Sequence, residues 1–195
     1  DNWGVAGAYT YISSDEGAGL ADTNGTPLAN TVMDIGVTNS IALSGWWAPS
    51  EVGIIPSFSA GWGVNSTEDE DDSNSTYDSA TSHSWYIGMQ WDDAFVEGND
   101  FGFAFGQPTF VTEWDLDADR STRIDGSEPQ GVRDGNYALE WWYKIQVSDN
   151  ITVTPAIYYL SRPFGHDTDT RLAEFDKRDS TLSNLGALVK TTFKF

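Results

Sequence analysis

The chain has 195 residues, with 30 Asp and Glu against 10 Lys and Arg, a net charge of −20. This length fits one domain or a piece of a larger one, and the absence of Cys excludes disulfides, Cys-ligated metal sites and a thiol nucleophile. The acidic balance argues against nucleic-acid binding, and without an apolar run of about 18 residues we expect no transmembrane helix; the start does not read as a signal peptide.

Eight stretches alternate between apolar and small or polar residues, the pattern of strands with two unlike faces. The clearest is 137–147, where the odd positions are all apolar and Glu140, Lys144 and Gln146 share the other face. No window has a convincing helical pattern. In chain order the stretches are 3–11, 35–44, 52–64, 84–91, 101–106, 137–147, 151–159 and 185–195.

The connections between these stretches alternate in length. Short turns follow Trp47, Trp91 and Val147, whereas 14–34, 65–83, 112–135 and 162–184 are long. Transmembrane barrels have short periplasmic turns on one rim and long extracellular loops on the other. The pattern therefore predicts an all-β, antiparallel transmembrane barrel over 1–195, with no separate soluble domain. A soluble acidic β-sandwich is the alternative fold.

Charge is concentrated in the long connections, which hold 22 of the 30 acidic residues. Aromatic residues gather near strand ends, where interfacial girdles belong. We expect the acidic loops to form a negative extracellular vestibule that mildly favours cations. Its residues are Glu68, Asp69, Glu70, Asp71, Asp72, Asp115, Asp117 and Asp119.

One acidic stretch is also a weak calcium candidate. Asp115, Asp117 and Asp119 have the spacing that opens an EF-hand loop, but the Gly at position 6 and the Glu at position 12 are missing. At most, loosely bound Ca²⁺ is expected, and no other cofactor.

The polar faces of the strands would line a water-filled lumen, where charges bias which solutes pass. Several inward positions in the N-terminal half are Gly, Ala or Ser, which suits a wide lumen or a wall against which a loop folds. This favours a larger barrel completed by other strands. The candidate pore-lining residues are Glu140, Trp142, Lys144, Gln146, Lys190, Lys194, Tyr86, Gln90, Thr152 and Thr154.

Two segments carry a family resemblance. Residues 136–160 read NYALEWWYKIQVSDNITVTPAIYYL and 191–195 read TTFKF. Together they resemble the C-terminal barrel segment of cyanobacterial outer-membrane porins, the OprB-like or "iron uptake porin" group. Residues 45–63, GWWAPSEVGIIPSFSAGWG, look similar to marine picocyanobacterial members.

The resemblance implies a porin of about sixteen strands in the outer membrane of a Gram-negative-type bacterium, passing small solutes, sugars and ions. It also implies a homotrimer and a barrel-assembly signal at Phe195. Members usually begin with a peptidoglycan-binding domain, which is not seen here. No enzyme motif is found. The alternative function is sugar binding by a soluble lectin-like sandwich; a phage-receptor role for the loops is compatible with the porin.

Overall fold

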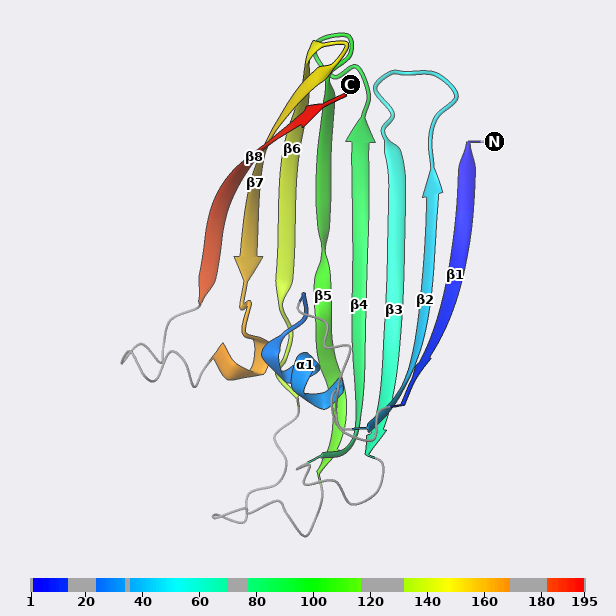
Figure 1. The fold of residues 1–195 in the computed structure, drawn as a ribbon, viewed down its shortest axis with the longest axis vertical. Coiled ribbons are helices and arrows are strands. Elements are labelled where there is room, and N and C mark those ends of the chain that lie inside the picture. The colour runs from blue at the N-terminus through cyan, green and yellow to red at the C-terminus, as the bar shows by residue number, and fades with distance from the viewer. Residues whose placement is uncertain are drawn as a thin grey trace.

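The computed structural model describes residues 2–13, 24–33, 36–69, 77–116, 132–168 and 182–194. They form one sheet of eight antiparallel strands in chain order, which confirms the all-β antiparallel prediction (Figure 1). The strands are β1 (Trp3–Ile12), β2 (Gly36–Trp47), β3 (Ser57–Asp69), β4 (Tyr77–Trp91), β5 (Asp100–Leu116), β6 (Tyr137–Ser148), β7 (Ile151–Ser161) and β8 (Ser183–Phe193).

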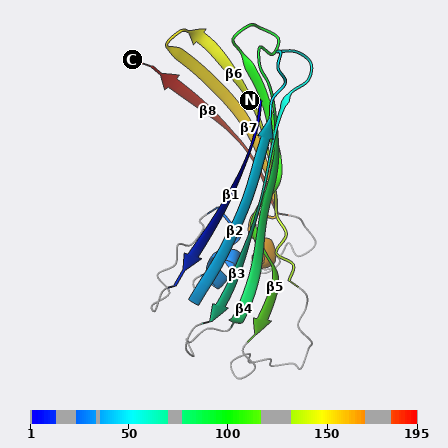
Figure 2. The same ribbon diagram turned by 90° about the vertical axis from the view of Figure 1, so that its right-hand side faces the viewer.

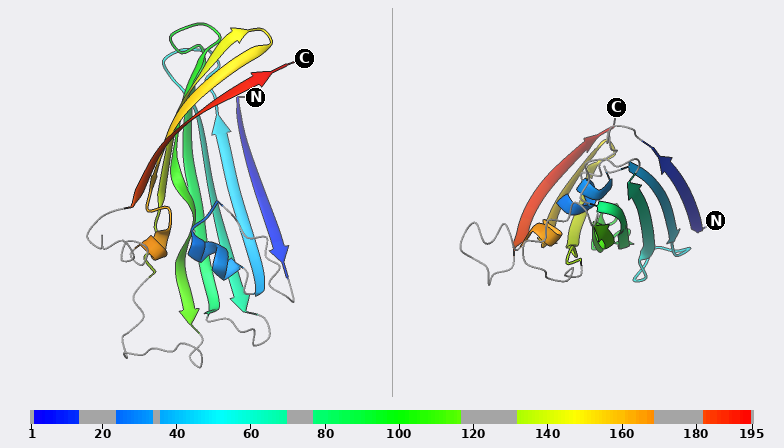
Figure 3. Two further views of the ribbon diagram at one scale, coloured as in Figure 1. Left: turned by 60° about the vertical axis from the view of Figure 1, so that its left-hand side comes forward. Right: turned by 90° about the horizontal axis from the view of Figure 1, so that it is seen from below.

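The sheet is strongly curved and twisted. Seen along the strands it forms an arc, and β6 to β8 lean away from β1 to β5 at one end (Figures 2 and 3). In the described part of the chain β1 and β8 each pair with a single neighbour, so the arc is open between them. Both chain ends lie at the rim where residues 48–56, 92–99 and 149–150 connect the strands (Figure 1). None of the described helices has the length and apolar character needed to cross a membrane.

The pairing register places the predicted apolar positions on one face. Leu43, Trp62 and Trp85 form one continuous row across β2, β3 and β4. The opposite face carries rows such as Ala42, Gly63 and Ser84. Because strand side chains alternate with a period of two, each strand has one face of each kind. Ala80, on the same face of β4 as Ser84, packs against the helix at Pro27–Met33, which lies inside the arc (Figure 3). The small-residue face is therefore the concave side, and the apolar face is the convex side.

The largest differences from the predicted strand boundaries lie at the start of β3, in the β3–β4 hairpin and in β5, which runs on to Leu116 instead of ending at residue 106 and so extends into the predicted connection 112–135. β3 begins at Ser57 instead of residue 52, and Ile54 lies in the turn with 93% of its surface exposed. Pro56 has no N–H to donate to a ladder, and the Trp91 indole donates a hydrogen bond of 2.8 Å to the Ile54 carbonyl, which fixes this turn.

The second difference is the predicted long loop at 65–83, which is wrong. β3 continues to Asp69 and β4 starts at Tyr77, so the connection is only 70–76. Polar side chains support this extension from within the ladder: the Thr38 and Thr67 hydroxyls lie 2.9 Å apart, and Asn65 Nδ2 donates to Ser82 Oγ at 3.0 Å. The strict alternation of short and long connections therefore fails at this hairpin.

The expectation of no helix is also corrected. Helix α1 (Pro27–Met33) lies against the concave face of the sheet (Figure 3). Thr26 caps it, since its hydroxyl accepts the Ala29 N–H at 3.1 Å, and Pro27 occupies the first helical position. The helix buries Leu28, Ala29 and Val32 against Ala80 of β4 and Val111 of β5.

Two irregularities in β5 create the docking place for α1. Trp85 pairs with Gln107 whereas His83 pairs with Phe110, so β5 holds an extra residue here, next to Pro108. A second shift lies between the Thr81 and Ser82 pairs. A bulge reverses which residues of a strand face each side. As a result Val111 turns to the concave face and gives α1 an apolar surface.

On the concave face, aromatic rings lie over glycines of the neighbouring strand. Trp142 covers Gly102, Tyr86 covers Gly61 and Tyr158 covers Gly186; a Cβ at any of these glycines would overlap the ring. Each of these pairs is directly opposite in the register, and Trp46 and Gly4 form a fourth. The glycine provides the space that the ring occupies.

We predict that Gly102→Ala destabilises the protein by about 1–3 kcal/mol, because the new methyl group displaces the Trp142 ring. The matched control is Gly7→Ala, where the Cβ would have its nearest neighbour, Leu43 Cδ2, at 3.4 Å. The control should change the free energy of unfolding by less than about 1 kcal/mol. Urea unfolding followed by tryptophan fluorescence measures both, and equal effects would contradict the ring–glycine packing.

Candidate functional site

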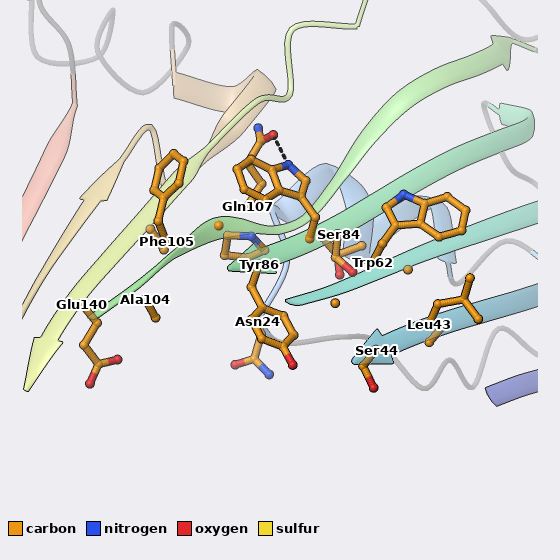
Figure 4. A pocket seen from close by; sticks show the side chains of 18 of the residues that line it. Asn24, Leu43, Ser44, Trp62, Ser84, Tyr86, Ala104, Phe105, Gln107 and Glu140 are labelled. Atoms are coloured by element: carbon orange, nitrogen blue, oxygen red, sulfur yellow. Dashed lines mark hydrogen bonds between the residues drawn. The ribbon is translucent and has the colours of Figure 1, made fainter. Parts of the chain in front are cut away.

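The concave face holds a hollow of about 660 Å³ between the sheet and the segment that leads into α1. Most of its floor is made of small residues, including Ala42, Gly63 and Ala104, and Asn24 borders it from the α1 side. Figure 4 shows Ser44, Tyr86 and Glu140 on one side of the sheet, whereas Phe105 and Gln107 point to the other. The hollow is therefore a shallow groove, called the trough below, whose lining is mostly small and apolar.

The sequence-predicted lining residues within the strands occupy the concave-face positions of the register. Glu140, Trp142, Lys144 and Gln146 come from β6, Tyr86 and Gln90 from β4, Thr152 and Thr154 from β7, and Lys190 from β8, with Lys194 directly after it. Tyr86 and Glu140 reach the hollow itself, together with Tyr158, which sequence reasoning did not select. Their role in solute passage stays a prediction.

Two charged residues of β6 differ in their surroundings. Lys144 Nζ lies 2.5 Å from Asp100 Oδ2, its directly opposite partner on β5. Glu140 forms no hydrogen bond or ion pair with the described residues. Both were predicted to be lumen charges of one strand, but the ion pair neutralises Lys144, whereas Glu140 stays unpaired among the described residues.

Three of the predicted vestibule acids lie in the described chain, and all three are at strand ends. Glu68 and Asp69 end β3, and Asp115 lies near the end of β5, where Ser79 Oγ donates to its carboxylate at 3.2 Å. Glu70, Asp71, Asp72, Asp117, Asp119 and Phe195 lie outside the described residues. In the described part of the chain, no group of three or more His, Cys, Asp and Glu side chains is placed to hold a metal. The calcium candidate stays a prediction.

Asp134 is the residue that holds the α1 segment to the wall. Its Oδ2 accepts hydrogen bonds from the Thr26 hydroxyl at 2.5 Å and from the Val111 N–H at 2.8 Å. Its Oδ1 accepts the His166 N–H at 2.8 Å, from the 3₁₀ helix η1 (Gly165–Asp167) that follows β7. One carboxylate thus joins four separate parts of the chain, and we call this group the Asp134 clamp.

The Asp134 clamp also closes a gap in the sheet. The β5–β6 pairing ends at Gly106 and Ala138, although β5 continues to Leu116. Beyond that point the Thr109 carbonyl accepts the Thr26 N–H at 2.9 Å and the Val111 N–H reaches Asp134. Buried backbone groups need partners, and here the clamp and the cap of α1 supply those that β6 does not.

Burial shapes the clamp. Asp134 has 1% of its surface exposed, and this desolvation raises the pKa of its carboxyl above the usual value, against the opposing effect of the three donors. Gly165 packs against the carboxylate with a φ of +50°, so a side chain there would meet Asp134. Arg162 adds hydrogen bonds of 3.0 and 3.1 Å to the Arg133 and Gly165 carbonyls.

We predict that Thr26→Val loosens α1, because it removes both the helix cap and one donor to Asp134. The free energy of local opening should fall by about 1–2 kcal/mol, measured by hydrogen exchange over residues 24–33. Thr31→Val is the matched control, since this exposed hydroxyl donates to the Pro27 carbonyl at 3.0 Å within the helix itself, and its effect should stay below about 0.5 kcal/mol. Unchanged exchange in Thr26→Val would refute the clamp.

Comparison with known proteins gives one family and one relative. The model of the carbohydrate-selective porin OprB family matches residues 33–195, which include β2 to β8. An uncharacterized protein of Synechocystis sp. (strain ATCC 27184 / PCC 6803 / Kazusa) is 33% identical over 81 residues, which cover 40% of this chain and 13% of that protein. No solved structure matches the chain.

Proposed function

Since the chain belongs to the OprB family of carbohydrate-selective porins, we propose that it forms part of the wall of an outer-membrane diffusion channel. The convex face contacts lipid and the concave face lines a water-filled lumen. Small hydrophilic solutes, sugars and inorganic ions pass through it by passive diffusion. The chain has no catalytic role in this proposal.

The observation that carries the proposal is the separation of the two faces. Large apolar side chains on the convex side are exposed in the isolated chain, among them Leu43, Trp62 and Ile157. A soluble single-layer sheet would need a second layer to cover such a surface. Lipid covers it in a membrane, whereas the concave floor of Gly, Ala and Ser suits contact with water.

The open arc supports a barrel larger than eight strands. The hydrogen-bonding groups on the outer edges of β1 and β8 need partners, because unsatisfied backbone groups are costly in lipid. An eight-stranded barrel fills its interior with side chains. The concave face here has mainly small side chains around the hollow, and α1 already packs against it. We therefore propose that further strands, to a total of about sixteen, complete the barrel.

The acidic residues near the α1 end of the barrel make its mouth negative, which mildly favours cations at low ionic strength. In this proposal that end is extracellular and the protein is a homotrimer in the outer membrane of a cyanobacterium. The loops at the same end are the surface that a phage could reach.

We predict stable single-channel steps when the detergent-extracted full-length protein enters a planar bilayer. Under a salt gradient the reversal potential should indicate a cation preference. The combined variant Glu70→Gln, Asp71→Asn and Asp72→Asn should have a weaker cation preference. The reduction should be larger when the protein is inserted with these residues toward the dilute salt solution than when they face the concentrated one. Salt screening shortens the reach of these charges from about 10 Å at 0.1 M to about 3 Å at 1 M.

The control removes three charges from the opposite rim, with Glu51→Gln, Glu97→Gln and Asp149→Asn, and should show the reverse dependence on orientation. Absence of steps from folded, inserted protein would count against an open porin. A protein that is soluble without detergent and binds sugars in that state would instead support the lectin-like sandwich.

A further inference from the structure

We propose that Glu140 is the specificity-determining residue of the lumen, a fixed charge that attracts small cations to the concave wall. This inference rests on the proposed porin function and names the group that acts inside the channel. It is distinct from the acidic mouth, which acts over a longer distance from the rim.

Glu140 is the single charged residue that lines the hollow, within the part of the chain that the structure describes. The other polar lining groups are neutral, chiefly Ser44, Ser84, Tyr86 and Tyr158. Glu140 is directly opposite Tyr158 on β7, whose ring is turned onto Gly186 of β8. The carboxylate is therefore partly buried beside the Tyr158 ring, and in the described part of the chain it has no partner that would neutralise it.

The neighbouring charges do not cancel this carboxylate. Lys144 is engaged with Asp100, and Lys190 pairs in register with Thr154, four residues along β8 from Gly186. The α1 segment, which narrows the space in front of the hollow, carries no charge over Pro27–Met33. A cation in the trough thus meets one uncompensated negative group at short range.

A short-range charge and a charged mouth respond differently to salt. The field of the mouth is lost when the Debye length falls to about 3 Å at 1 M. A solute that passes along the concave wall comes within contact distance of Glu140 at any salt concentration. Cation preference that persists in concentrated salt is therefore the signature of Glu140.

The test uses Glu140→Cys in the full-length protein, exploiting the absence of Cys from this sequence. A thiosulfonate reagent carrying a sulfonate restores the negative charge, and one carrying a trimethylammonium group makes it positive. Reversal potentials are measured in KCl gradients near 1 M, before and after each reagent. Relative to the unmodified thiol, the K⁺-to-Cl⁻ permeability ratio should rise about 1.5-fold to fivefold with the first reagent and fall by a similar factor with the second, the range for one exposed charge.

The matched control is Glu97→Cys, an exposed position in the connection 92–99, at the rim away from α1. Neither reagent should change the permeability ratio of this variant at 1 M. Glu140→Gln should behave as the unmodified Glu140→Cys variant, and Glu140→Asp as the wild type. Complete modification without a change in the ratio would overturn the inference, as would failure of the channel-open protein to react. In both cases wild-type steps persist, whereas loss of all steps in the wild type would overturn the porin itself.

Discussion

The strict two-residue alternation of a one-layer sheet is the constraint on which the rest of this structure depends. Within the described ranges no second sheet lies behind it, so each strand residue faces either the convex or the concave side. A register slip of one residue would exchange the two sides along a whole strand. The seven strand pairs keep apolar positions together on the convex side, apart from the bulged part of β5.

The bulges of β5 are where the alternation is broken, and the interior structure begins there. The extra residue beside Pro108 brings Val111 to the concave side, and α1 packs on it. The same stretch of β5 has lost β6 as a neighbour, so Thr26 and Asp134 complete its hydrogen bonds. A local irregularity thus explains both the place of the helix and the need for a buried carboxylate.

The strands and their two faces could be predicted because alternation is a local property of the sequence. The porin resemblance, based on residues 136–160 and the final strand, was confirmed by the family match over 33–195. Helix α1 could not be predicted: it has seven residues, no charged capping pattern, and a stability that comes from docking. Thr26 followed by Pro27 was the available signal of its start. Asp134 was indistinguishable from other loop acids, because its partners Thr26, Val111 and His166 are distant in sequence.

The packing of aromatic rings over glycines has a consequence for how the concave surface tolerates change. In each pair the ring occupies space that a Cβ on the opposite strand would need, so neither residue can be replaced independently of the other. Tyr86 and Tyr158, from two such pairs, also line the hollow. In the proposed channel the glycine of each pair would therefore make room for the ring, and the aromatic residue would present the surface that a solute meets.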